Sequence, residues 1–126
     1  MKKVLLLVED DEVLLDALKS ELNQKDEFAI FVAKDGNEGL KIALHEHPQL
    51  ILLDLLMPKM DGIAMLKKLR EDEWGKNVKV IILTNLDDKN KIAEAVANRV
   101  FDYMIKSNWK LGDIYKKVST ELKYIE

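Results

Sequence analysis

Four short apolar runs in this chain each end on polar residues that differ in side-chain chemistry. The residues that follow the four runs are, in chain order, Glu9, Asp10, Asp54, Thr84 and Lys106. If the runs are neighbouring parallel strands, their carboxyl ends meet at one edge of a single sheet. The sequence therefore predicts that three carboxylates, a hydroxyl group and an amine converge at that edge.

The spacing of apolar residues predicts strands that alternate with helices. Apolar runs lie near residues 3–8, 28–33, 49–54, 78–83 and 100–105. The central runs are continuously apolar, which is typical of parallel strands covered on both faces. Stripes at helical spacing separate them, and the last stripe comprises Leu111, Ile114, Tyr115, Val118, Leu122 and Ile125. This alternation predicts right-handed crossovers and a doubly wound α/β sheet.

Acidic and amide residues that precede the helical stretches are predicted helix N-caps. Asp61 precedes the third stretch, Asp87 the fourth and Asn108 the fifth. Asp11 and Glu12 follow the first apolar run and are predicted to cap the first helix, because acidic side chains favour helix N-termini.

Composition narrows the class of protein. The length of 126 residues is typical of one domain, so we expect a single domain over residues 1–126. The net charge is -3, from 20 basic and 23 acidic residues, and no basic stripe indicates nucleic-acid binding. The sequence has no cysteine, which excludes disulfides and thiolate chemistry. No apolar stretch approaches membrane-spanning length, and we expect a cytoplasmic protein.

The predicted carboxylate cluster suits a divalent cation. Glu9, Asp10 and Asp54 would repel one another and raise each other's pKa, and a hard cation would relieve that repulsion. Magnesium fits best, since it binds a few carboxylates together with water and phosphate oxygens. One carboxylate could then attack phosphorus and form an aspartyl phosphate. Lys106 and Thr84 would contact the phosphoryl oxygens.

Four segments carry a resemblance to a known family. They are residues 7–11, 53–62, 82–84 and 102–106, and the second contains the pattern Asp-x-x-Met-Pro-x-Met-Asp-Gly. With these motifs the chain resembles the receiver domains of two-component response regulators, especially the stand-alone chemotaxis-regulator type, over essentially its whole length. The resemblance implies a flavodoxin-like, doubly wound sheet of five parallel strands in the order 2-1-3-4-5, with five helices.

The resemblance implies that Asp54 accepts a phosphoryl group and that Mg²⁺ is the cofactor. Glu9 and Asp10 match the acidic pair of the family and would hold the metal together with Asp54. Leu56, two residues after the phosphoacceptor, would contribute its backbone carbonyl to the metal. The apolar side chains of Leu56 and Leu86 would order an attacking water poorly, so we expect a phosphoryl group that is lost slowly.

Two further residues match the switch of the family, and a third matches its phosphate-binding lysine. Thr84 would be the hydroxyl residue that moves toward the phosphoryl group, and Tyr103 the aromatic residue that turns inward when Thr84 moves. Lys106 would be the lysine that binds the phosphate. The change would be read out at the surface formed by the fourth helix, the fifth strand and the fifth helix.

The resemblance also implies partners. The phosphoryl donor would be a sensor histidine kinase or a phosphotransfer protein, and the chain would catalyse only its own phosphorylation and dephosphorylation, so it is not expected to be an enzyme. No output domain is visible, so a stand-alone receiver and a receiver cut from a longer regulator both stay open. We expect a downstream protein target, no direct contact with nucleic acid or membrane, and a monomer or a weak phosphorylation-dependent dimer.

Three positions depart from the usual family pattern. Asn85 follows Thr84 where a small residue is common, and it would alter the access of a kinase histidine or of water. Ser107 replaces the usual proline after the lysine, so we expect a trans peptide bond and a less rigid loop. Residues 98–101 replace a Gly-Ala segment, which calls into question any dimer through the fourth helix, the fifth strand and the fifth helix.

Three alternative functions stay open. Asn85 and Ser107 leave room for a receiver-like docking module that works without phosphorylation, although the intact site residues argue against it. Many phosphohydrolases with an aspartate nucleophile need a second aspartate as general acid at the position of Leu56, so turnover by this chain should be poor. A flavodoxin-type cofactor binder needs a phosphate-binding loop after the first strand, where Glu9 and Asp10 would repel a phosphate.

Overall fold

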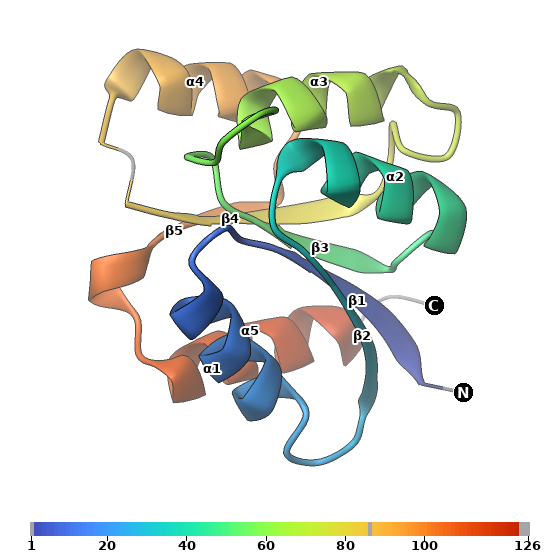
Figure 1. Cartoon of the computed structure of the whole chain (residues 1–126), viewed down its shortest axis with the longest axis vertical. Helices are drawn as coiled ribbons and strands as arrows, with labels where there is room; N and C mark the ends of the chain where they lie inside the picture. The colour runs from blue at the N-terminus through green and yellow to red at the C-terminus, as the bar shows by residue number, and fades with distance from the viewer. Residues whose placement is uncertain (1, 86, 124–126) are drawn as a thin grey trace.

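The computed structural model describes residues 2–85 and 87–123, which form a parallel sheet between two layers of helices (Figure 1). The strands are β1 (Lys3–Val8), β2 (Phe28–Ala33), β3 (Leu50–Leu53), β4 (Lys79–Thr84) and β5 (Asp102–Ile105). The helices are α1 (Glu12–Leu22), α2 (Gly36–Glu46), α3 (Gly62–Glu71), α4 (Lys89–Ala97), the 3-10 helix η1 (Lys106–Asn108) and α5 (Leu111–Lys123). Leu86 and Ile125 lie outside the described residues. No helix in the described ranges is long and apolar enough to cross a membrane.

The strand order is β2-β1-β3-β4-β5, and all of these neighbours pair in parallel, as the sequence predicted. This is the doubly wound, flavodoxin-like arrangement, in which ligand sites form at the carboxyl edge where the strand order reverses. Here the order reverses between β1 and β3. The last β1–β3 pair is Val8 with Leu53, so the residues that follow these two strands begin side by side.

The core lies in two layers, one on each face of the sheet. Along β1, Leu6 and Val8 pack with α2, α3 and α4, whereas Leu5 and Leu7 pack with α1 and α5 (Figure 1). All four side chains are at most 1% exposed. Because successive strand side chains point to opposite faces, a continuously apolar strand supplies both layers at once. This is why the central runs show no alternation with polar residues.

Aspartate side chains cap the first four α-helices. The four caps are Asp11, Asp35, Asp61 and Asp88. Each accepts hydrogen bonds from amides of the first helical turn, which have no acceptor inside the helix. The prediction of Asp87 as the cap of α4 was therefore wrong by one residue. The prediction for Asn108 was also wrong, because Asn108 ends η1 and α5 begins only at Leu111.

Candidate functional site

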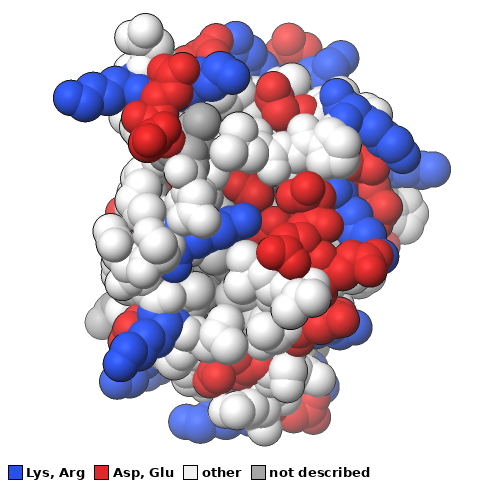
Figure 2. All heavy atoms as spheres, turned by 60° about the vertical axis from the view of Figure 1, so that its left-hand side comes forward, with Lys and Arg blue, Asp and Glu red and all other residues white. Residues whose placement is uncertain are grey.

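The carboxylates of Glu9, Asp10 and Asp54 form a cluster at the carboxyl edge of the sheet. One carboxylate oxygen from each residue lies within 4.8 Å of the other two. Glu9 and Asp54 are buried, and Asp10 is exposed to solvent. Figure 2, which brings the left side of Figure 1 forward, shows acidic side chains gathered into one patch on this face. The three carboxylates that the sequence predicted to converge are thus neighbours in space.

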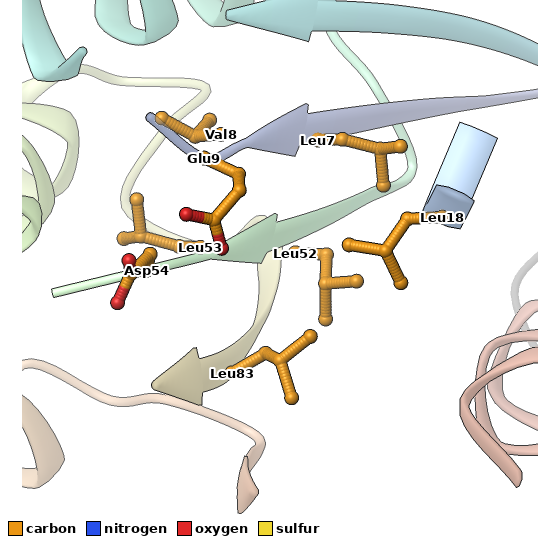
Figure 3. A pocket seen from close by; sticks show the side chains of 8 residues that line it. All are labelled: Leu7, Val8, Glu9, Leu18, Leu52, Leu53, Asp54 and Leu83. Carbon is orange, nitrogen blue, oxygen red and sulfur yellow. The ribbon is translucent and has the colours of Figure 1, made fainter. Parts of the chain in front are cut away.

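Backbone hydrogen bonds to neighbouring strands hold the two buried members of this cluster. The Glu9 amide donates to the carbonyl of Ala33 at 2.9 Å, and the Asp54 amide donates to the carbonyl of Val8 at 3.0 Å. Each bond extends the ladder of the sheet one residue beyond the end of the strand. The two side chains lie close together at one side of a small cavity of about 10 Å³, and the other residues that line it are leucines and a valine (Figure 3). The two carboxylates therefore border an apolar part of the core.

Lys106, which follows the edge strand β5, brings an ammonium group to the carboxylates. Its Nζ atom lies 2.6 Å from Oε1 of Glu9 and 2.9 Å from Oδ2 of Asp54. The side chain of Lys106 is 17% exposed, so little water screens these ion pairs. Lys106 pairs with two carboxylates while Asp10 adds a third to the cluster, so negative charge exceeds the charge of this ammonium group when all three are ionised.

The local environment changes the proton affinity of Glu9 and Lys106. Burial raises the pKa of Glu9 to about 7, although hydrogen bonds from Lys106 and from the Asp11 amide oppose that rise. The Asp54 carboxylate adds to the rise by repulsion. Burial alone would lower the pKa of Lys106, but its hydrogen bonds to Glu9 and Asp54 outweigh burial and raise that pKa. The lysine therefore stays charged, and Glu9 keeps its proton to a higher pH than an exposed glutamate would.

The oxygen-rich cluster fits a hard divalent cation. Mg²⁺ takes oxygen ligands in a compact octahedron, usually one or two carboxylates together with water and phosphate. Glu9, Asp10 and Asp54 offer carboxylate oxygens, and Leu56 lies in the loop directly after Asp54. The Leu56 amide donates to Oδ1 of Asp54 at 3.2 Å, which holds the Leu56 backbone beside that carboxylate. A cation would supply the positive charge that the cluster lacks.

Two glycines hold the loop between β3 and α3. The Gly62 amide donates to the Leu55 carbonyl at 3.1 Å, and a Cβ atom at position 62 would overlap the carbonyl oxygen of Asp54. The Gly36 amide, at the start of α2, donates to the Met60 carbonyl at 2.8 Å. Only a residue without a side chain lets the backbones approach this closely. The loop that carries Asp54 is thus fastened to the first turns of both α2 and α3.

Thr84 and Tyr103 lie on β4 and β5, the two strands that come after β3 in the order of the sheet. Thr84 is the last residue of β4 and is fully buried. Tyr103 pairs with Ile82 across the β4–β5 ladder, and its ring packs partly buried against the core layer beneath α2, α3 and α4. Burial and the nearby Asp87 carboxylate raise the pKa of the Tyr103 hydroxyl. The structure therefore places both predicted switch residues on the β4–β5 side of the acidic cluster.

Two of the unusual positions contact each other. Asn85 follows β4 and Ser107 lies in η1, and Oδ1 of Asn85 accepts a hydrogen bond from the Ser107 amide at 3.1 Å. The described residues contain no cis peptide bond, so the expectation of a trans bond at Ser107 is confirmed. In the sequence, both residues stand out as departures from the family pattern. Their contact could not be predicted, because it depends on how β4 and β5 pair.

The third unusual segment, residues 98–101, is fastened by Arg70 of α3. The Arg70 guanidinium donates to the carbonyls of Asn98, Gly75, Val78 and Arg99, at 2.7 to 2.8 Å. Phe101 is 49% exposed, with the ammonium of Lys79 4.0 Å from its ring centre. No pattern in the sequence indicated this role of Arg70, because the acceptors are backbone carbonyls that any residue could provide.

The sequence profile of the family described as "Response regulator receiver domain" matches residues 5–119. The chain belongs to this family. Receiver domains are signalling modules of two-component systems and are generally not enzymes. They interact with histidine kinases or phosphotransfer proteins and bind Mg²⁺ through an acidic cluster. The acidic cluster at the carboxyl edge of this sheet fits that family property.

Known receiver-containing proteins resemble this receiver domain in sequence and in structure. The probable C4-dicarboxylate response regulator DctR of Bacillus subtilis is 34% identical over 102 residues, which cover 80% of this chain and 44% of DctR. The chain thus spans less than half of that relative. The phosphorylated cyanobacterial phytochrome response regulator RcpA is 25% identical, with a TM-score of 0.81 over 99% of this chain and 94% of that chain. The Mn²⁺-bound form of response regulator Rcp1 is 27% identical, with a TM-score of 0.80 over 97% and 93%.

Proposed function

We propose that this receiver domain is a phosphorylation-gated switch in which Asp54 accepts a phosphoryl group from a phosphohistidine. The donor is a sensor histidine kinase or a phosphotransfer protein. The observation that carries the proposal is the position of Lys106, whose ammonium group contacts both Asp54 and Glu9. A lysine in that position neutralises charge that develops on a phosphoryl group attached to Asp54.

The contacts of Asp54 support this transfer. A carboxylate oxygen of Asp54 attacks the phosphorus atom, the phosphorus–nitrogen bond of the donor breaks, and its electron pair returns to the imidazole nitrogen. The Leu56 amide and the Lys106 ammonium, which contact the two carboxylate oxygens at 3.2 and 2.9 Å, orient the nucleophile. After transfer, the hydroxyl of Thr84, at the end of the neighbouring strand, donates a hydrogen bond to a phosphoryl oxygen.

Glu9, Asp10, Asp54 and the backbone carbonyl of Leu56 would hold Mg²⁺ in this site. Bound metal supplies positive charge that offsets the negative charge of the incoming phosphoryl group. Support comes from the mutual proximity of the three carboxylates and from the existence of a Mn²⁺-bound form of the related Rcp1. Mg²⁺ and Mn²⁺ share a preference for octahedral oxygen ligands.

Phosphorylation would change the surface formed by α4, β5 and α5. A phosphoryl group adds a charge of about -1.5 to -2 at neutral pH, which attracts Thr84 and Lys106 and biases a two-state equilibrium. Tyr103 lies on β5 opposite Ile82, two residues before Thr84, so a shift of Thr84 reaches the tyrosine through one pair of strands. We infer that this surface controls a protein partner or an output domain in a longer regulator.

Intact mass spectrometry after incubation with acetyl phosphate tests the proposal. One phosphoryl adduct is expected in the presence of Mg²⁺, and none in the presence of a chelator. Asp54→Asn should lose the adduct, whereas Asp16→Asn, which changes an exposed aspartate of α1, should retain it. Retention of the adduct in Asp54→Asn would show that another residue is the phosphoacceptor.

A further inference from the structure

The hydrogen bond between Asn85 and Ser107 joins the two loops that carry the switch hydroxyl and the phosphate-binding lysine. The β4–β5 ladder ends at the pair of Thr84 with Ile105. Asn85 directly follows β4, and its carboxamide oxygen accepts a hydrogen bond from the Ser107 amide at 3.1 Å. A side chain therefore provides the next connection between these strands after the backbone ladder has ended.

The donor of this bond is an amide that needs an outside acceptor. The 3-10 helix η1 begins at Lys106, and its N-cap residue Ile105 makes no side-chain hydrogen bond to it. The first amides of a helix have no acceptor within the helix. Asn85 supplies an acceptor for one of them from a different loop. A proline at position 107 would abolish the bond, because proline has no amide hydrogen.

We propose that Asn85 is a positioning residue for phosphoryl transfer, an inference that rests on the function proposed above. By holding the Ser107 amide, Asn85 fixes the start of η1, whose first residue, Lys106, contacts Asp54 and Glu9. Asn85 is also bonded directly to Thr84 along the chain. The bond therefore links the loop of the hydroxyl to the loop of the ammonium group.

The exposure of the bond sets the size of its effect. Asn85 and Ser107 are both exposed, so water competes for the carboxamide and for the amide. The net contribution of such a bond to an equilibrium or a barrier corresponds to about two- to tenfold. Asn85→Ala should therefore slow phosphorylation by acetyl phosphate by about that factor. The affinity for Mg²⁺ should not change, because Asn85 lies outside the carboxylate cluster.

A matched asparagine and two double-mutant cycles separate positioning from general damage. Asn90→Ala, which changes an exposed asparagine in the first turn of α4, should keep the parent rate. Ser107→Pro removes the donor, and Lys106→Ala removes the group that is positioned. Adding Asn85→Ala to either variant should slow the reaction no further. Full additional slowing in both backgrounds would overturn the proposal, since Asn85 would then act independently of both residues.

Hydrogen exchange at the Ser107 amide tests the bond without any chemistry. The amide should be protected in the unphosphorylated parent and in Ser107→Ala, and it should lose protection in Asn85→Ala. An unprotected Ser107 amide in the parent would overturn the proposal. A parent chain that takes up no phosphoryl group would refute the proposed function itself. A parent that is phosphorylated at a rate that Asn85→Ala leaves unchanged would refute the positioning role alone.

Discussion

Nζ of Lys106 lies 2.9 Å from Oδ2 of Asp54, although 52 positions separate the two residues in the chain. Asp54 follows β3 and Lys106 follows β5, so the lysine side chain crosses the end of β4, which lies between these strands. The same ammonium group also reaches Glu9 after β1. One flexible side chain thus connects the edge strand of the sheet with its two central strands.

Replacing Lys106 should separate metal binding from signalling. In Lys106→Ala the three carboxylates stay in place, so calorimetric titration should still show Mg²⁺ binding. The phosphorylated variant should lack the spectral change that the phosphorylated parent shows, because nothing then pulls the β5 end toward Asp54. Lys110→Ala, an exposed lysine before α5, serves as the control. Identical spectral responses in Lys106→Ala and the parent would argue against this role of the lysine.

The raised pKa of Glu9 makes the stability of the metal-free protein depend on pH. The folded-state pKa of about 7 exceeds the unfolded value of 4.5, so the folded protein binds more protons between these values. Glu9 therefore lowers the free energy of unfolding as pH rises from about 4.5 to about 7, and the full penalty is present above that window. Urea unfolding in a chelator should show this fall, and Glu9→Gln should remove it.

Magnesium should reverse the pH effect of Glu9. Because Mg²⁺ binds the ionised carboxylate, its affinity should rise as pH increases toward about 7, and binding below that pH should release a proton. Calorimetry in buffers of different ionisation enthalpy measures that proton. Glu9 should titrate between pH values of roughly 5 and 8. A Mg²⁺ affinity that does not change over this range would contradict the raised pKa.

Two glycine substitutions should have opposite effects on stability. Gly62→Ala places a Cβ atom against the carbonyl of Asp54, and we expect a loss of about 1–3 kcal/mol together with slower phosphorylation. Gly112 lies in α5, and a new Cβ atom there would meet nothing within 4 Å apart from its chain neighbours and the backbone of its own helix. Gly112→Ala should therefore raise stability by up to about 1 kcal/mol, because alanine favours helices. Chemical denaturation of both variants measures the contrast.

Arg70 should be worth more to stability than its place on a helix surface suggests. Arg70→Ala leaves four carbonyls without their donor, and we expect a loss of about 2–3 kcal/mol. Arg70→Lys should recover little of it, since an ammonium group cannot reproduce the planar fork. Lys68→Ala on the same helix, where the lysine is exposed, should change stability by less than about 0.5 kcal/mol.

The aspartyl phosphate of this chain should decay slowly. Leu56 is 48% exposed beside Asp54 and offers no side-chain group that could orient a water molecule. We expect the phosphorylated form to persist for minutes or longer, and Leu56→Gln, which adds an amide there, to shorten its lifetime. Intact mass followed over time after removal of acetyl phosphate gives both values. A parent half-life in the range of seconds would contradict the expectation.

The sequence predicted the sheet well because its central strands are unambiguous. Each residue of β3 is buried on one face or the other, so the apolar run itself marks the strand. The fifth strand was predicted from residue 100, but β5 begins at Asp102. Arg99 has a positive φ of 63°, and Arg70 binds the carbonyls of Asn98 and Arg99, so the chain before β5 is shaped by a contact with α3. Local periodicity does not report such a contact.

The acidic cluster could be predicted for a related reason, and the cross-loop contacts could not. Residues that end neighbouring parallel strands must meet, whatever the details of packing, and Glu9 and Asp54 follow that rule. The contact of Asn85 with Ser107 depends on the register of β4 with β5 and on the short helix η1. Neither this register nor the position of η1 could be predicted from local patterns in the sequence.

The backbone bonds that end each strand divide the site into a fixed and a movable part. The amides of Glu9 and Asp54 bind the carbonyls of Ala33 and Val8, so the backbones of these two acidic residues are held to the central strands. On the other side, the loops after β4 and β5 meet through the side chain of Asn85, which water can replace. A charge added at Asp54 would therefore shift mainly the loops after β4 and β5. These loops can move because the backbone hydrogen bonds between the two strands end before them.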